Sequence, residues 1–197
     1  MACKIRVFTL VLGCFAFSSL LVNAASTRRL DGSWKRYYNR QWGYCVSYPS
    51  RWLKADAYEG AGIVVESGVK KQSLPMGEID VGVLPAAHVN PTLTPAMSLA
   101  DDLEVHLRGL KKFVRAERIE VLEQRPTDLV GNSALFSKER YYDPLERATW
   151  VGEVIFARRD SNLFRLELEC RADQVDRFEP IFTRLVGSFQ FDCSERK

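Results

Sequence analysis

The feature that most constrains the fold is a strand–turn–strand pattern between residues 149 and 170. Within Leu163–Cys170, apolar and charged residues alternate from Phe164 onward, which is typical of a strand with one covered face and one face in water. Thr149–Ala157 is also strand-like, and Asp160-Ser161-Asn162 supplies turn residues between the two. The pattern predicts an antiparallel hairpin. The residues expected to face the core are Phe164, Leu166 and Leu168, and those expected to face water are Arg165, Glu167 and Glu169.

Further strands and two helices are expected around this hairpin. The strands are expected at residues 42–49, 62–67, 78–84, 118–123, 133–142 and 188–191. Residues 51–54 are expected to form a turn or one helical loop, and Pro126 and Gly131 to break the chain. Amphipathic patterns predict helices over Pro95–Val114, with Thr94 as N-cap, and over Ala172–Val186, ended by Gly187. Grouped strands with helices laid on them indicate an α+β layered sandwich with a mostly antiparallel sheet.

The N-terminus predicts export. Lys4 and Arg6 precede the almost wholly apolar Val7–Val22 and a small residue at Ala24, which indicates a signal peptide over residues 1–24 and a periplasmic or secreted protein. A membrane anchor is the alternative, but the apolar run of about 16 residues is short for a span of about 20. A lipoprotein signal at Cys14 is less favoured, because the apolar run continues past it. The rest has the size of one domain, expected over 42–193 with a tail at 194–197.

A basic and aromatic arm is expected over residues 25–41. One interpretation is an electrostatic arm for anionic lipid headgroups or an acidic partner; the other is a tail whose aromatic side chains fold back on the sheet. The candidate partner surface is Arg36, Tyr37, Tyr38 and Arg40. The formal net charge is only +3 and the leader carries part of it, so the chain is not expected to bind nucleic acid.

Cleavage after Ala24 would leave Cys45, Cys170 and Cys193. An odd number permits at most one disulfide within the chain. Cys170 and Cys193 both fall in phase with core residues, so Cys170–Cys193 is the favoured pair and Cys45–Cys193 the second choice. Three buried, reduced cysteines remain an open alternative.

No catalytic set stands out. The two histidines, His88 and His106, lack the spacing of a zinc site, and the least unlikely metal pair is His88 with Asp80. Cys45 with His106 could form a nucleophilic pair, but a cysteine on a strand is more often inert. A nucleophile elbow and a phosphate-binding loop are both missing from the sequence. We therefore expect a protein that is not an enzyme and that uses no cofactor.

Both ends of the expected domain resemble PsbP-like proteins. Tyr38-Asn39, the segment Trp42–Pro49 and Trp52 resemble the opening of those domains, and a Leu163–Cys170 strand, a helix and Ser188-Phe189 resemble their close. The resemblance implies an α/β/α sandwich with a central antiparallel sheet and a non-enzymatic role. Plant and cyanobacterial members assist photosystem II in the thylakoid lumen, whereas many bacterial members are exported proteins of unknown role. The short leader differs from a transit peptide and argues against a photosystem role.

These observations together predict an exported binding or assembly module at the extracytoplasmic side of a membrane. Its expected partner is a protein of the cell envelope, and the arm could add contact with a membrane surface. The alternative is an exported metal-binding protein or small hydrolase that uses His88, His106 and Cys45.

Overall fold

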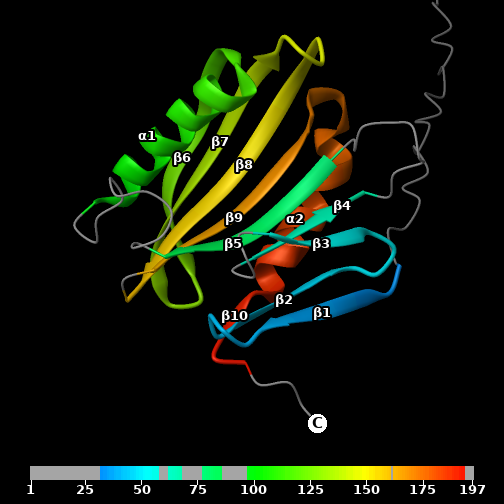
Figure 1. The fold of residues 1–197 in the computed structure, drawn as a ribbon, viewed down its shortest axis with the longest axis vertical. Coiled ribbons are helices and arrows are strands. Elements are labelled where there is room, and N and C mark those ends of the chain that lie inside the picture. Colours follow the sequence, from blue (N-terminus) through cyan, green and yellow to red (C-terminus); the bar gives the residue numbers. More distant parts are fainter. Residues whose placement is uncertain (1–31, 58–61, 68–76, 86–96, 161, 194–197) are drawn as a thin grey trace, which may run out of the picture. The chain divides into compact units, whose positions relative to one another are not determined.

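A seven-stranded antiparallel sheet dominates the computed structural model, which describes residues 32–57, 62–67, 77–85, 97–160 and 162–193. Its strand order is β3-β4-β5-β9-β8-β7-β6, and every neighbouring pair is antiparallel (Figure 1). The expected hairpin at 149–170 is confirmed as β8 and β9. The bounds are β3 (Leu53–Ala57), β4 (Gly62–Glu66), β5 (Gly77–Pro85), β6 (Glu117–Leu129), β7 (Asn132–Asp143), β8 (Ala148–Arg159) and β9 (Asn162–Arg171).

A second, three-stranded sheet has the order β1-β2-β10. It consists of β1 (Trp34–Asn39), β2 (Tyr44–Pro49) and β10 (Gln190–Phe191), so it joins the beginning and the end of the described chain. The arm expected over 25–41 is therefore partly a strand, because Trp34–Asn39 pairs along its whole length with β2. The expected signal peptide and residues 25–31 lie outside the described residues.

Two α-helices complete the part of the fold that the structure describes. The helix α1 (Leu99–Gly109) is continued by one π-helical turn, η2 (Leu110–Val114). It begins at Leu99 and not at Pro95, because Ser98 and Asp101 form a reciprocal capping box: Asp101 N donates to Ser98 Oγ, and Ser98 N donates to the Asp101 carboxylate. The helix α2 (Val175–Ser188) follows a 3₁₀ turn over Ala172–Gln174.

The end of α2 also differs from the expectation. Gly187 lies inside α2, and the helix ends one residue later because the Ser188 hydroxyl donates to the Leu185 carbonyl and accepts from the Ser47 amide. Among the described residues, no helix is long and apolar enough to span a membrane.

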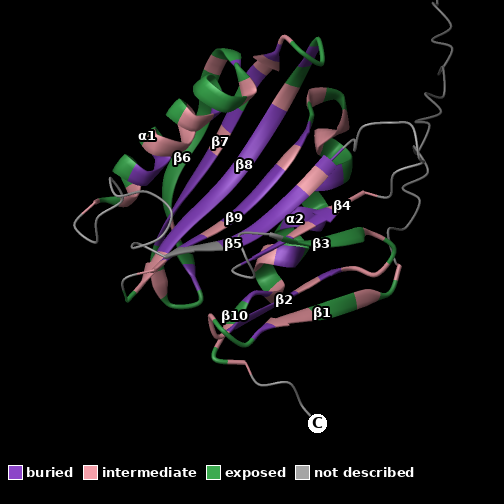
Figure 2. Cartoon of the chain, viewed as in Figure 1, coloured by how far each residue is buried: buried purple, intermediate pink, exposed green. Residues whose placement is uncertain are grey.

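The two helices pack against opposite sets of alternating side chains of the large sheet. Phe178, Phe182 and Leu185 of α2 pack on the set that includes Leu166, and Leu103 of α1 packs on the other set. Figure 2 shows β8 and β9 buried along most of their length. We call these surfaces the α2 face and the α1 face. The α+β class with a mostly antiparallel sheet is confirmed.

Two local expectations need correction. The turn expected over residues 51–54 is present at Arg51 and Trp52, but Leu53 and Lys54 already belong to the strand β3. Pro126 does not break the chain: β6 runs through it, paired with Leu135. This is possible because β6 is the last strand of the sheet, and a strand at the edge needs ladder hydrogen bonds on one side only. The expected break at Gly131 is confirmed as the tight β6–β7 turn, where Gly131 has a φ of +78°.

Candidate functional site

The charged side of β9 is not in water as expected. Arg165, Glu167 and Glu169 lie on the α1 face, and Glu167 is only 6% exposed. The register places Glu167 opposite Asp80, and Glu169 opposite Glu78, on the neighbouring strand β5. The α1 face is therefore apolar near Leu103, where the helix packs, and strongly polar further along the same strands.

The centre of this polar region is His106, which α1 points at the sheet. Its Nε2 lies 2.8 Å from Glu139 Oε1 on β7 and 3.5 Å from Glu167 Oε1 on β9. The three side chains are 6%, 0% and 7% exposed, respectively. Burial by itself would lower the pKa of His106, but the neighbouring carboxylates of Glu167 and Glu139 raise it above its ordinary value. The imidazole thus joins the helix to two separate strands.

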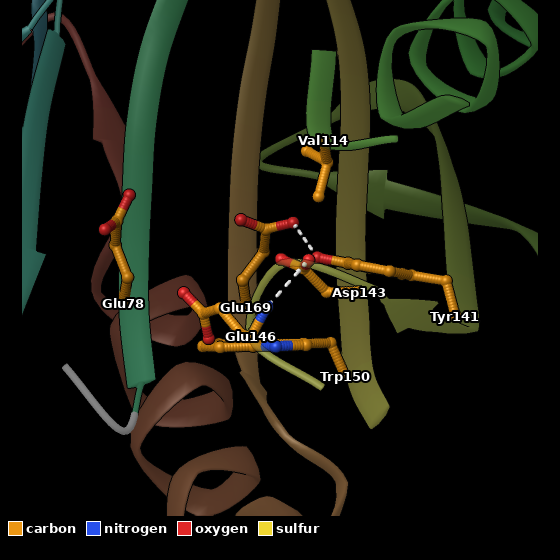
Figure 3. A pocket seen from close by; sticks show the side chains of 7 residues that line it. All are labelled: Glu78, Val114, Tyr141, Asp143, Glu146, Trp150 and Glu169. Carbon is orange, nitrogen blue, oxygen red and sulfur yellow. Dashed lines mark hydrogen bonds between the residues drawn. The ribbon is translucent and has the colours of Figure 1, made fainter. Parts of the chain in front are cut away.

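An open pocket of about 230 Å³ adjoins this region. Figure 3 shows its lining side chains converging from β5, β7, the β7–β8 turn, β8, β9 and the end of η2: Glu78, Val114, Tyr141, Asp143, Glu146, Trp150 and Glu169. The Tyr141 hydroxyl donates to Glu169 Oε1 at 2.7 Å. Four carboxylates beside two aromatic rings make a lining that suits a cationic group.

Two of the pocket carboxylates, Glu78 and Glu169, are held in an environment that opposes ionisation. Burial, and next the charge of Glu167, raises the pKa of Glu169 to about 7. Burial, and next the charge of Asp80, raises the pKa of Glu78 to about 7. Burial likewise raises the pKa of Tyr141. Near neutral pH this pocket therefore holds proton-exchanging groups that a bound cation would favour in their ionised form.

The structure brings together only some of the predicted site residues. Asp80 lies on the α1 face and accepts from Arg165 at 2.9 Å, but His88 lies outside the described residues, so the predicted metal pair stays untested. His106 is at the centre of the polar region. Cys45 cannot act as a nucleophile with His106, because its sulfur is bonded to Cys193 in a disulfide. The predicted set of His88, His106 and Cys45 therefore lacks a thiol nucleophile.

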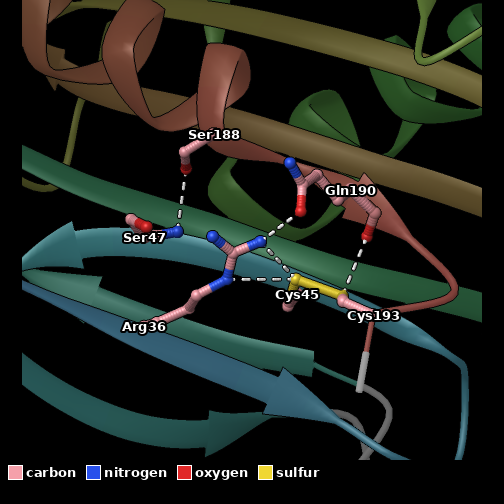
Figure 4. Close-up of a disulfide and its surroundings, with 6 residues drawn as sticks. All are labelled: Arg36, Cys45, Ser47, Ser188, Gln190 and Cys193. Atoms are coloured by element: carbon pink, nitrogen blue, oxygen red, sulfur yellow. Dashed lines mark hydrogen bonds between the residues drawn. A yellow bond between two sulfur atoms is a disulfide. The ribbon is translucent and has the colours of Figure 1, made fainter. Parts of the chain in front are cut away.

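The favoured disulfide is also wrong. Cys45 pairs with Cys193, the second choice, with a Cα–Cα distance of 6.1 Å (Figure 4). Cys170 is free and buried. The physical reason is strand pairing: β10 lies beside β2, with Gln190 opposite Cys45, so the chain leaving β10 brings Cys193 to Cys45. Cys170 lies in the large sheet opposite Gly77 and Val151. Burial raises the pKa of the Cys170 thiol to about 12, so it is unreactive.

The predicted partner surface is divided by the structure. Arg36 is exposed and donates to Cys45 Sγ and to the Gln190 side chain (Figure 4). Tyr38 is partly buried beneath the Arg36 guanidinium, and Arg40 is exposed in the turn after β1. Tyr37 instead packs against Tyr44 of the core. Arg36, Tyr38 and Arg40 can face a partner, whereas Tyr37 is a packing residue.

Comparison with solved structures identifies the fold. Cyanobacterial PsbP (CyanoP) from Synechocystis sp. PCC 6803 superposes with a TM-score of 0.58 and 16% identity, over 81% of this chain and 93% of CyanoP. The chain has the PsbP-like fold. The resemblance found in the sequence is thus confirmed, although at this identity the likeness shows the fold and not the activity. No family model and no curated protein matches the sequence.

Two bacterial proteins share the PsbP-like fold. LpqN from Mycobacterium tuberculosis, which is involved in cell envelope biogenesis, has a TM-score of 0.51 and 14% identity, over 80% of this chain and 90% of LpqN. PA94 from Pseudomonas aeruginosa, a protein of unknown function, has a TM-score of 0.50 and 10% identity, over 84% and 99% of the two chains. At these identities the likeness shows the fold alone.

Sequence reasoning missed Glu139, Glu167 and Tyr141 as members of a buried site. A signal was available in β7, where Ser137, Glu139 and Tyr141 occupy alternate positions and so share one face. Polar residues on one face of a long strand usually indicate solvent. Only the position of α1, which is set by contacts distant in sequence, shows that this face is covered.

Proposed function

We propose that the chain is an exported, non-enzymatic binding or assembly module at the extracytoplasmic side of a membrane. The observation that carries this proposal is the Cys45–Cys193 disulfide, which joins β2 to the segment after the last strand. Such bonds persist in oxidising compartments outside the cytoplasm. The signal peptide predicted over residues 1–24 supports the same compartment, and so does the fold that the chain shares with an envelope-biogenesis protein.

The partner proposed is a protein of the cell envelope. In this proposal the domain is an α/β/α sandwich that serves as a rigid scaffold, and the contact surface is Arg36, Tyr38 and Arg40. These residues lie on or beside β1, which is an edge strand of the small sheet. An edge strand presents backbone groups that a partner can pair with. Contact of the basic arm with anionic lipid is the accompanying proposal for the membrane surface.

Thiol counting tests the proposed compartment. The precursor contains five cysteines, two of which, Cys3 and Cys14, belong to the predicted leader. Protein from the native host is trapped with acid, denatured and labelled with a maleimide polymer that adds a visible mass for each thiol. An exported, cleaved and oxidised chain should take one label, at Cys170, and three after reduction. A chain that takes five labels without reductant would rule out both export and the disulfide.

A pull-down from the envelope fraction tests the partner surface. We consider envelope proteins that the wild type enriches and that stay bound in a high-salt wash. The double variant Tyr38→Ala/Arg40→Ala should recover at least tenfold less of such a protein than the wild type does. The matched control Arg108→Ala removes an exposed arginine of α1 and should recover as much of the envelope protein as the wild type does. Equal retention by both variants would contradict the surface. Pelleting with anionic liposomes at low and high salt separates lipid contact, which salt weakens, from protein contact.

A further inference from the structure

Three side chains with metal-ligating atoms meet beneath α1. They come from three elements: His106 from α1, Glu139 from β7 and Glu167 from β9. Their Nε2 and carboxylate oxygens all lie within 4.8 Å of one another. Within the described ranges it is the one place where three such groups converge in this way. One imidazole nitrogen and two carboxylate oxygens form a donor set that suits first-row divalent ions better than Ca²⁺ or Mg²⁺.

We propose that His106, Glu139 and Glu167 bind a first-row divalent metal ion, with Zn²⁺ as the reference case. The ion would connect α1 to two strands of the sheet and would leave one coordination position for water. The proposal is independent of the proposed export and partner, because it depends only on these three side chains and their surroundings.

The spacing of the donor atoms is compatible with coordination after a small movement. Zinc bonds of about 2.0–2.2 Å at a tetrahedral angle place two donor atoms about 3.4 Å apart. His106 Nε2 and Glu167 Oε1 are already 3.5 Å apart. His106 Nε2 and Glu139 Oε1 are 2.8 Å apart and hydrogen-bonded. The ion would therefore replace that hydrogen bond and separate the two groups by about half an ångström.

The outer groups around the cluster support this assignment. Ser137 Oγ donates to Glu139 Oε2 at 3.1 Å, and Arg165 Nε contacts Glu167 Oε2 at 3.3 Å. Each carboxylate thus has its Oε2 atom held by a neighbour and its Oε1 atom directed at His106. Groups that orient the ligands in this way are the usual second layer of a metal site. The imidazole ring itself packs edge-on against Phe156, with a centroid distance of 5.8 Å.

The cluster also has the charge and the access that a cation needs. Asp80, Glu78 and Glu169 lie on the same face, and the Arg165 guanidinium is shared between Asp80 and Glu167. The open pocket includes Tyr141 and Glu169, which are the next residues on this face after Glu139 and Glu167. A cation could therefore approach along carboxylates from the pocket to the cluster.

Metal titration of the untagged, chelator-treated protein tests the proposal. Calorimetry with Zn²⁺ should give one site per chain, and Co²⁺ should give the visible absorption bands of a tetrahedral or five-coordinate ion. We expect His106→Gln and Glu139→Gln to weaken binding at least a hundredfold, and Ser137→Ala to weaken it about tenfold. The matched control Glu153→Gln removes a buried carboxylate of the α2 face, paired with Lys138, and should bind normally.

Several results would overturn the proposal: no stoichiometric binding by the wild type, normal binding by a folded His106→Gln variant, or equal loss in Glu153→Gln. If His106→Gln does not fold, the His88→Gln variant decides, because it leaves His106 as the single imidazole of the chain. One equivalent of Zn²⁺ should shift the His106 ring resonances in NMR spectra of that variant. Unshifted resonances would contradict the site.

Discussion

The α2 face and the α1 face belong to the same strands, yet they bury different chemistry. On β9, Leu166 and Leu168 are fully buried beneath α2, whereas Arg165 and Glu167 lie on the side of α1. The α2 face is enclosed by α2 and by the small sheet, whose Tyr44 joins the same core. Among the elements that the structure describes, one helix, α1, covers the α1 face. A single amphipathic helix leaves part of this face to polar groups, which must then be paired.

The two faces contribute differently to the stability of the protein and to its specific contacts. Apolar burial on the α2 face is non-directional and contributes in proportion to area. The α1 face depends on particular pairs, since a buried charge that loses its partner is costly. Mutations on the α2 face should therefore act mainly on global stability. Mutations on the α1 face should act mainly on the position of α1 and on ligand binding.

The largest expected effect is on the α2 face. Phe178 is fully buried and meets Trp52 edge-on at a centroid distance of 5.8 Å. Phe178→Ala should lower the free energy of unfolding by about 3–5 kcal/mol in a urea titration. The matched variant Phe113→Ala removes a ring that is 76% exposed and should change it by less than about 0.5 kcal/mol. Similar losses in both variants would show that the α2 face is not the main core.

The disulfide should have the next largest effect, and on the same side of the sheet. Cys45→Ala/Cys193→Ala should lower the free energy of unfolding by about 2–5 kcal/mol. Dithiothreitol should destabilise the wild type to a similar extent and leave the double variant unchanged. Amide exchange should accelerate in β1, β2 and β10 and remain slow in α1. Faster exchange in α1 would contradict the separation of the two faces.

On the α1 face, the pair Asp102–Arg158 should behave as a unit. The Arg158 guanidinium contacts both Asp102 oxygens at 2.7 Å, and the Asp102 side chain is fully buried. Asp102→Leu should cost about 2–3 kcal/mol in unfolding free energy, because it removes the buried carboxylate that binds the guanidinium. Asp102→Leu/Arg158→Leu should recover at least about 1 kcal/mol of that loss. Additive losses would mean that the pair does not hold α1.

The β8–β9 hairpin shows which features of the fold can be predicted from the sequence and which cannot. Alternation over Leu163–Cys170 correctly predicts the strand, its antiparallel partner and which side chains share a face. It cannot predict what covers the second face, because α1 reaches that face through contacts such as His106 with Glu139, which are 33 residues apart in sequence. The site was missed for this reason. The sequence indicates that α1 is amphipathic, but it does not indicate which strand lies opposite His106.

The N-terminal strand and the disulfide were missed for a related reason. The charges of Trp34–Asn39 suggested an arm, but an edge strand of a small sheet tolerates charge on its outer side, and its pairing with β2 settles its structure. The phase of Cys193 predicted an inward side chain, but a disulfide also needs a partner at a suitable distance. That distance follows from β10 lying beside β2, which two residues of strand could not reveal.

The smallest expected effect is the dependence of stability on pH through Glu78, which lines the open pocket on the α1 face. Its pKa is about 7 in the folded protein and about 4.5 as an ordinary value, because burial and then Asp80 oppose ionisation. A raised carboxyl pKa favours the folded state below about pH 4.5, and that contribution is lost as pH rises to about 7. Glu78→Gln should therefore match the wild type at pH 4.

At pH 8 the Glu78→Gln variant should be more stable than the wild type by about 1 kcal/mol, since solvent reduces the full effect on a partly exposed group. Urea titrations of both proteins at half-unit steps from pH 4 to pH 8 measure the difference directly. The matched control Glu120→Gln, at an exposed carboxylate of β6, should give no pH-dependent difference. A variant that is less stable at pH 8 would mean that ionised Glu78 has a stabilising partner. The carboxylate of Glu78 would then already be paired within the protein, as the charged groups beneath α1 are, and would not be available to a bound cation.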